Sequence, residues 1–182
     1  AQLRTVASDR FAWQARGSWL RTRFADYRRS ASEFSVANRF GAEVRAEVHP
    51  DAARTVLVGT EATLSDVTSD IFGTHSQSEF AAYGQSEQRI GPARLTAGAR
   101  VDYLAVDAGS VTAGVSPRIG GTLPLADGTL RGSVGRGFRA PTMAERFVHT
   151  FALGFEVIPN PTLRPETGWS AAVGHPTPVL GV

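Results

Sequence analysis

The chain has 182 residues, a formal net charge of +2, no Cys, and 19 basic residues that are all Arg. No segment approaches the ~18 consecutive apolar residues of a transmembrane helix, which excludes a helical membrane protein, and the Arg residues are too scattered for a dedicated nucleic-acid surface. The mean hydropathy of −0.13 still permits a β-barrel, because barrel strands alternate between polar and apolar faces. The absence of Cys is consistent with the periplasm or the cell surface.

Turn residues divide the chain into segments in which polar and apolar residues alternate, which is the period of a β-strand. In chain order, the pattern predicts strands over residues 1–7, 10–24, 36–48, 54–65, 78–89, 93–105, 111–124, 128–138 and 167–175. Soluble strands average about 5–6 residues, whereas a tilted membrane strand needs about 9–11. The predicted lengths therefore favour a transmembrane antiparallel β-barrel, of which the chain supplies about nine meander strands.

Short and long connections alternate along the chain. We expect short turns at Ser8-Asp9, His49–Ala53, Gly91-Pro92 and Leu125–Gly128, and longer polar connections at Ala25–Ser35, Ser65–Gln77, Val106–Ser110 and Arg139–Glu166. Outer-membrane barrels have short turns at the periplasmic rim and longer loops outside. The long connections are therefore the expected outer loops, although Val106–Ser110 is only modestly long.

The alternation gives the strands two chemically different faces. One face carries no charge and comprises Phe11, Trp13, Ala15, Gly17, Trp19, Phe40, Ala42, Val44, Ala46, Val48, Val56, Val58, Thr60, Ala62, Leu64, Leu95, Ala97, Ala99, Val101, Tyr103, Val115, Pro117, Ile119, Gly121, Leu123, Leu130, Gly132 and Val134. The other carries Arg16, Arg39, Glu43, Arg45, Glu47, Glu61, Arg94, Arg100, Asp102, Arg118 and Arg131. An Arg facing lipid at mid-depth costs about 2–4 kcal/mol, so contact with lipid would enforce this separation.

A soluble sheet with one face on a core would show the same alternation. Three features favour the membrane: the strand lengths, an apolar face rich in Ala and Gly, and aromatic residues near the strand ends, where an interfacial girdle would place them. These aromatic residues are Phe11, Trp13, Trp19, Phe40, Tyr103 and Trp169.

Two segments carry a more specific pattern, GRGFRAPTMAERF at residues 135–147 and NPTLRPET at 160–167. Together they resemble the barrel of TonB-dependent outer-membrane receptors, in which a strand ends in a "GRGFRAPS–ELY"-like element and the chain returns through an "NPxLKPE"-like element. The residues that match are Gly137, Phe138, Arg139, Ala140, Pro141, Glu145, Asn160, Pro161, Leu163, Pro165 and Glu166. Thr142, Arg146-Phe147 and Arg164 are mild departures. The resemblance covers roughly residues 36–174.

The motif also makes physical sense by itself. Pro141 has no N–H and is expected to end a strand. Pro161 and Pro165 restrict φ and stiffen the return path. The charged residues Arg136, Arg139, Glu145, Arg164 and Glu166 are expected to form an ion-pair cluster that braces the loop base, an interpretation that we favour over direct ligand contact.

The resemblance implies a receptor in the bacterial outer membrane that imports a scarce nutrient, such as a ferric siderophore or a cobalamin-like molecule, with energy from the TonB complex. It also implies a plug that precedes the barrel and contacts TonB. We expect residues 1–174 to be a partial barrel without that plug, and residues 175–182 to be a non-strand tail left by a truncation or a frame error. Nine strands leave two open edges, which lipid does not tolerate, so function is expected to belong to a longer parent.

Catalytic and metal-binding patterns are absent from the sequence. His49, His75, His149 and His175 have no metal-ligand spacing, and the Ser residues lie outside any G-x-S-x-G context. Asp66, Asp70 and Glu79 could suggest a cation site in a loop, but they supply too few ligands for one. We therefore expect no enzyme activity, no metal site and no cofactor.

The expected ligand contacts lie on the outer loops, at Phe72, His75, Arg139, Arg146, Phe151 and Phe155. The expected partners are a small-molecule or metal-chelate substrate, the TonB complex and membrane lipid, without nucleic acid. Two other hypotheses remain open at this point. One is a passive structural or pore-forming barrel, and the other is a soluble β-sandwich used for adhesion.

Overall fold

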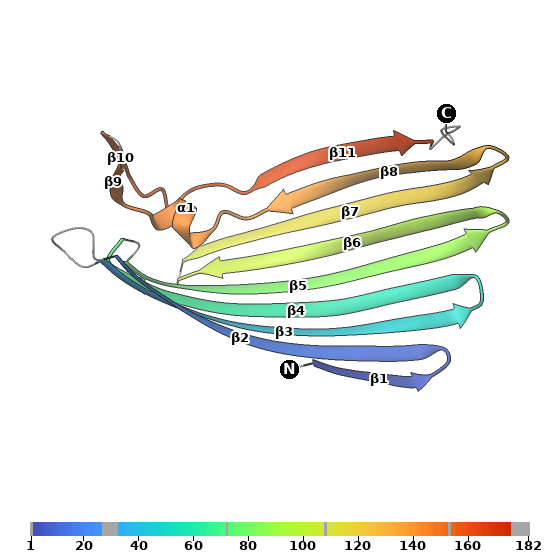
Figure 1. Cartoon of the computed structure of the whole chain (residues 1–182), viewed down its shortest axis with the longest axis horizontal. Helices are drawn as coiled ribbons and strands as arrows, with labels where there is room; N and C mark the ends of the chain where they lie inside the picture. The colour runs from blue at the N-terminus through green and yellow to red at the C-terminus, as the bar shows by residue number, and fades with distance from the viewer. Residues whose placement is uncertain (1, 27–32, 72, 108, 153, 176–182) are drawn as a thin grey trace, which may run out of the picture.

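The computed structural model describes residues 2–26, 33–71, 73–107, 109–152 and 154–175. Nine antiparallel strands form one sheet in the order β1-β2-β3-β4-β5-β6-β7-β8-β11 (Figure 1). They are β1 (Gln2–Ser8), β2 (Phe11–Asp26), β3 (Glu33–Asp51), β4 (Arg54–Ser69), β5 (Gly73–Ile90), β6 (Ala93–Val106), β7 (Ser110–Leu125), β8 (Gly128–Arg139) and β11 (Glu166–Gly174). The nine predicted strands are therefore confirmed, in a meander.

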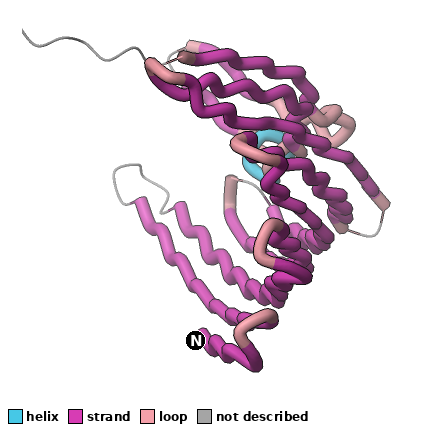
Figure 2. Tube along the Cα trace, turned by 90° about the vertical axis from the view of Figure 1, so that its right-hand side faces the viewer, coloured by secondary structure: helices cyan, strands magenta, loops and turns pink. Residues whose placement is uncertain are grey.

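The sheet is strongly curved and does not close within the described part of the chain, where β1 and β11 are its two edges (Figure 2). A single curved sheet contradicts the β-sandwich hypothesis, which requires two packed sheets. No helix in the described residues is long and apolar enough to span a membrane.

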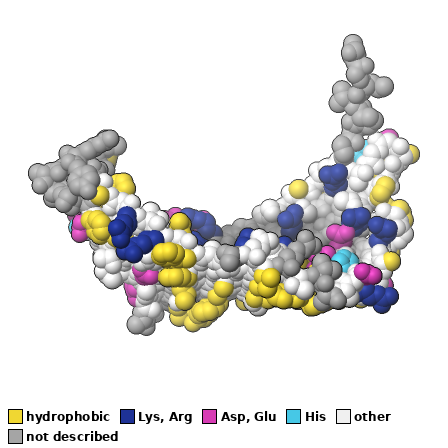
Figure 3. All heavy atoms as spheres, turned by 60° about the horizontal axis from the view of Figure 1, so that its bottom comes forward, with side chains coloured by type: hydrophobic (Ala, Val, Ile, Leu, Met, Phe, Trp, Pro, Cys, Tyr) yellow, Lys and Arg dark blue, Asp and Glu magenta, His cyan; other side chains and the backbone are white. Residues whose placement is uncertain are grey.

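Strand pairing aligns the apolar positions of neighbouring strands. Ala15 lies opposite Val44, Val44 opposite Thr60, and Val101 opposite Val115. The same register continues to β8, where Ile119 lies opposite Val134. The two-face prediction is thus confirmed, with hydrophobic side chains on the convex side and Arg side chains along the concave side (Figure 3). We call the concave face the inner wall.

Most strands are longer than the sequence pattern predicted, and most of the extension is at the end opposite the short turns. β3 has 19 residues and β5 has 18, against about 9–11 needed to cross a membrane. The predicted loop Ser65–Gln77 is therefore wrong for most of its length, because Ser65–Ser69 and Gly73–Gln77 continue the β4–β5 ladder. The predicted loop Ala25–Ser35 is shortened in the same way, by pairing as far as Asp26↔Glu33.

The rim with these extensions also carries the long connection between β8 and β11, and we call it the outer rim. This connection was predicted as a long polar outer loop. It instead contains the helix α1 (Met143–Phe147) and a small hairpin of β9 (Thr150–Ala152) and β10 (Phe155–Val157). α1 lies on the inner side of the curved sheet, against β5 (Figure 2).

Candidate functional site at the inner wall and outer rim

The inner wall is crossed by a network of ion pairs. Arg100 on β6 bonds Glu61 on β4 at 3.0 Å and Asp102 on its own strand at 2.7 Å. Arg16 on β2 bonds Glu43 on β3 at 2.9 Å. These pairs link β2 to β3 and β4 to β6, so side-chain contacts as well as the backbone ladder connect the strands of the wall.

Tyr83 connects two parts of this network. Its hydroxyl donates to Glu43 at 2.7 Å, and its ring lies near the Arg100 guanidinium, with 6.0 Å between the guanidinium carbon and the ring centroid. The ring can cross β4 because residue 59 is Gly, where a Cβ atom would come within 2.4 Å of the ring. Phe138 covers Gly114 in the same manner, because a Cβ atom at residue 114 would come within 2.2 Å of the Phe138 ring. Aromatic rings over strand glycines are a known device of curved sheets.

The motif segment begins where β8 leaves the sheet. Pro141 is buried and ends the strand, as predicted. Thr142 caps α1 through a capping box with Glu145, whose backbone N–H donates to the Thr142 hydroxyl at 3.2 Å. The hydrogen bond from the Thr142 backbone N–H to Glu145, followed by those from Arg139 and the Thr142 hydroxyl, lowers the pKa of Glu145 to about 2.

The predicted ion-pair cluster forms around Arg139. Its guanidinium bonds Glu145 at 2.5 Å and Glu166 at 3.3 Å, which joins both halves of the motif. Arg136 instead donates to the carbonyl of Val115 at 2.9 Å, and Arg164 is exposed. Arg139 and Glu166 are also paired residues of β8 and β11, so the ion pair reinforces the strand ladder where the connection returns.

α1 is fixed to the inner wall by its last two residues. Arg146 is 1% exposed and donates to the Thr112 hydroxyl at 3.4 Å. The Phe147 ring stacks on the His75 ring with centroids 3.6 Å apart and an interplanar angle of 10°. Arg146 therefore lies within the packing beneath the loop, and His75 is covered on one face.

His75 also holds the turn between β6 and β7. Its Nδ1 lies 2.8 Å from an Asp107 carboxylate oxygen, and the backbone N–H of Ser76 donates to the other oxygen at 2.9 Å. Burial opposes ionisation of Asp107, but the bonds from Ser76 and His75 outweigh it and hold its pKa below the usual range. Asp107 has a positive φ of 49°, which these bonds stabilise.

The return element, residues 160–167, is held in place by backbone hydrogen bonds. The backbone N–H of Asn160 donates to the Arg146 carbonyl at 2.8 Å, and the Leu163 N–H donates to the Asn160 carbonyl at 3.2 Å. Pro161 is exposed and Pro165 half-buried. At the start of the motif, Gly137 lies opposite Gly168, and Ala140 lines a small cavity together with Phe138.

The remaining predicted contacts lie apart from this packing. Phe151 and Phe155, on the β9–β10 hairpin, are 62% and 75% exposed. Phe72 lies outside the described residues. The structure thus separates these predicted contacts into a packed group, with buried Arg146 and half-buried His75, and an exposed aromatic hairpin.

Thr112 and Asp107 were not singled out from the sequence, and Phe147 was noted only as a departure from the family motif. They contact residues more than 30 positions away, or belong to a helix of five residues, and neither feature leaves a periodic signal. The Asp-x-Gly sequence at 107–109 was the one available hint of a tight turn.

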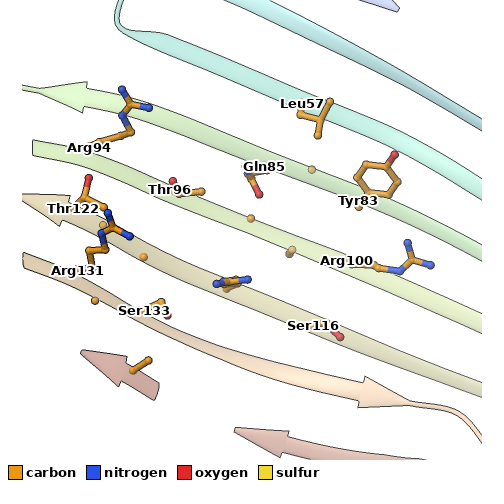
Figure 4. Close-up of a pocket in the computed structure, with 18 of the residues that line it drawn as sticks. Leu57, Tyr83, Gln85, Arg94, Thr96, Arg100, Ser116, Thr122, Arg131 and Ser133 are labelled. Carbon is orange, nitrogen blue, oxygen red and sulfur yellow. The ribbon is translucent and has the colours of Figure 1, made fainter. Parts of the chain in front are cut away.

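A groove of about 670 Å³ lies on the inner wall near the short turns (Figure 4). Its described lining includes four Arg residues, Arg94, Arg100, Arg118 and Arg131, and no Asp or Glu. A second cavity, of about 370 Å³, lies nearer the outer rim and is lined by Glu61, Glu79 and Asp102 together with Arg100. The inner wall is therefore basic toward the short turns and acidic toward the outer rim.

The fold and the position of the motif define the class of protein as an outer-membrane β-barrel of the receptor type. A family profile described as "TonB dependent receptor-like, beta-barrel" matches residues 3–175. The chain belongs to this family, whose barrels lie in the outer membrane.

Among solved structures, the chain is similar to "Copper transporter OprC", with 16% sequence identity and a TM-score of 0.62. The match covers 80% of this chain and 30% of that one, so the chain spans about a third of the length of that solved relative. No curated protein sequence matches the chain. Within the described residues, no group of three or more His, Cys, Asp or Glu side chains is placed to hold a metal ion.

Proposed function

We propose that this chain is the wall segment of a receptor that captures a scarce nutrient at its outer rim and passes it inward with energy from the TonB complex. The proposed substrate is a metal chelate such as a ferric siderophore or a cobalamin-like molecule. Family membership supports the transport class, and the geometry of the outer rim supports the place of capture.

The proposal rests on a difference between the two halves of the connection between β8 and β11: one half is packed and the other is exposed. The motif half packs against the inner wall through Arg146, which is 1% exposed, and through the stack of Phe147 on His75. The hairpin half projects Phe151, Phe155 and Ile158, all more than 60% exposed. Exposed aromatic and aliphatic side chains on a braced base are suited to bind the apolar body of a chelate.

Binding by the receptor that carries this segment tests the assignment. The double variant F151S/F155S is expected to lose about tenfold or more in affinity for a ferric siderophore, because each ring contributes roughly 1 kcal/mol or more of apolar contact. The matched control Glu156→Gln changes the same hairpin, at the His149–Glu156 pair, but retains both rings, and is expected to bind normally. Unchanged affinity in F151S/F155S would contradict the hairpin assignment.

Uptake separates this function from a passive pore. An active receptor accumulates substrate only while the membrane is energised and TonB is present, whereas a passive pore equilibrates it without either. Because the solved relative is named a copper transporter, a copper salt is a necessary second substrate in the same assay. Uptake of copper but of no chelate would contradict the proposed substrate class while retaining the transport class.

A further inference from the structure

Two outer connections meet at one side chain, His75 of β5. Its ring stacks on Phe147 of α1, in the connection between β8 and β11, with centroids 3.6 Å apart. Its Nδ1 lies 2.8 Å from the carboxylate of Asp107, in the turn between β6 and β7. The His75 side chain is 19% exposed. The β6–β7 turn therefore contacts the β8–β11 connection through an imidazole that belongs to neither of them.

Asp107 fixes the orientation of that imidazole. One carboxylate oxygen lies against Nδ1 of His75, and the other accepts from the backbone N–H of Ser76 at 2.9 Å. Although burial raises it, the bonds from Ser76 and His75 hold the pKa of Asp107 below its usual range. An ionised carboxylate only accepts hydrogen bonds, so Nδ1 is the donor. A ring held at Nδ1 keeps its face within 10° of parallel to the Phe147 ring.

The hairpin of β9 and β10 is supported at its base. Among the described elements, β9 and β10 pack only against each other, and they project beyond α1 at the outer rim (Figure 1). Before β9, the His149 N–H donates to the Ile71 carbonyl at 3.2 Å. After β10, the Asn160 N–H donates to the Arg146 carbonyl of α1 at 2.8 Å. The position of the hairpin therefore follows the position of α1.

From these contacts we infer that Asp107 is a positioning residue for the hairpin that carries Phe151 and Phe155. Asp107 orients His75, which holds Phe147 and with it α1, and α1 sets where the two exposed rings lie. The inference rests on the proposed function, in which these rings bind the substrate. It adds a determinant of affinity that lies in a different connection and acts through His75, without contact to the substrate.

Loss of this link is expected to widen the range of positions that the hairpin samples. Apparent affinity falls in proportion to the fraction of molecules in the binding-competent arrangement. Buried Arg146 still holds α1 to the wall when the link is broken. The expected loss of affinity is therefore partial, about threefold to tenfold.

Asp107→Asn is the variant that tests the link. Asn tolerates the positive φ of 49° at this position, but its amide nitrogen replaces one of the two oxygens that face His75 and Ser76. The matched control is Asp66→Asn. It removes another carboxylate of the outer rim, whose hydrogen-bond donor is Asn38 on β3.

Two measurements report on the two halves of the inference. Without ligand, spin labels at Phe155→Cys and Thr68→Cys, in a receptor without other Cys, give the distribution of hairpin positions relative to β4. This distribution is expected to be broader in Asp107→Asn and unaltered in Asp66→Asn. With unlabelled receptor, the affinity for a ferric siderophore is expected to be about threefold to tenfold weaker in Asp107→Asn and unaltered in Asp66→Asn.

A double-mutant cycle separates positioning from direct contact. The F151S/F155S background has no rings to position, so Asp107→Asn is expected to cause no further loss of affinity there. Direct contact between Asp107 and the substrate would instead cause the same loss in both backgrounds. Full additivity would overturn the inference, and so would an unaltered distance distribution in folded Asp107→Asn.

Urea unfolding shows whether Asp107→Asn is folded. If it is not, His75→Leu removes the same bond from the other side and retains an apolar contact for Phe147. His75→Leu is expected to broaden the distance distribution, and an unaltered distribution would overturn the inference.

The outcomes separate this inference from the proposed function. Normal affinity in F151S/F155S, with a broadened distribution in Asp107→Asn, would refute capture by the hairpin and retain the positioning role. Weakened affinity in F151S/F155S, with no effect of Asp107→Asn on position or affinity, would refute the positioning role and retain capture by the hairpin.

Discussion

At the scale of single residues, the inner wall depends on glycines that make room for aromatic rings. Gly59 illustrates this, because the Tyr83 ring lies over it and reaches Glu43 on the next strand. Gly59→Ala is expected to displace the ring and break the Tyr83–Glu43 hydrogen bond, lowering the free energy of unfolding by about 1–3 kcal/mol. Urea unfolding of the receptor in lipid vesicles measures the change.

Gly168→Ala is the matched control for that substitution. A Cβ atom at residue 168 would meet no other atom within 4 Å, so this variant is expected to unfold like the wild type. An equal loss of stability in the two Gly→Ala variants would show that the loss does not depend on the space that residue 59 leaves for the Tyr83 ring. The interpretation based on the Tyr83 ring would then be wrong.

Glu145 gives a residue-scale prediction in pH. Its folded pKa of about 2 lies below the ordinary value of 4.5, so ionised Glu145 stabilises the capped helix above pH 4.5. That contribution is lost as the pH falls from 4.5 through about 2. In Arg139→Gln, which removes one of the hydrogen bonds that lower the pKa, the Glu145 carboxyl is expected to titrate at higher pH.

An NMR titration of the Glu145 side-chain carboxyl measures this shift directly. The control is Arg164→Gln, a nearby exposed Arg in the return element, which is expected to leave the titration unaltered. Identical titration curves for Arg139→Gln and the wild type would show that the ion pair does not contribute to the capped conformation in solution.

At the scale of elements, α1 depends on the wall beneath it. A five-residue helix is too short to be stable alone, and its attachment is the Phe147–His75 stack with buried Arg146. Phe147→Ala is expected to remove about 0.5–1.5 kcal/mol of aromatic stacking in addition to apolar burial, and so to release the helix. Amide exchange at Val148 and Asn160, whose N–H groups bond Ala144 and Arg146, is expected to accelerate by about tenfold.

Phe151→Ala is the control for this release, because Phe151 lies in the same connection but is 62% exposed. Exchange at Val148 and Asn160 is expected to be unaffected by it. Unaltered exchange in Phe147→Ala would show that Arg146 alone holds the helix.

The sequence predicted the elements in which polar and apolar side chains alternate regularly. Alternation of side chains located all nine sheet strands and assigned Arg100 and Glu61 to the same face as Arg16 and Glu43. It failed at the outer rim, where both faces of β4 and β5 are polar and the pattern is typical of a loop, although backbone pairing continues. α1 was not predicted for another reason: its five residues are too few to show a helical period, although Thr142 and Glu145 have the spacing of a capping box.

At the scale of the whole molecule, the residue types on the convex face predict how deep the sheet lies in the membrane. Trp19 and Phe40 stack side by side on this face, with centroids 6.2 Å apart, and we expect them to mark one interface of the membrane. Beyond them the same face becomes polar: Arg21 lies opposite Asn38, and Asn38 donates to Asp66 at 2.7 Å. We therefore expect the strands to extend beyond the membrane on the outer side, which would explain their excess length.

Arg substitutions at two depths test this placement. Val44, on the convex face four residues from Phe40, lies in the expected hydrocarbon band, so Val44→Arg is expected to destabilise the receptor by about 2–4 kcal/mol. Thr68 lies on the same face four residues beyond Leu64, the pairing partner of Phe40, so Thr68→Arg is expected to cost about 0–1 kcal/mol. Urea unfolding in lipid vesicles measures both values. Similar costs at the two positions would mean that the extended ladder lies within the bilayer, and the Trp19–Phe40 pair would then not mark the interface.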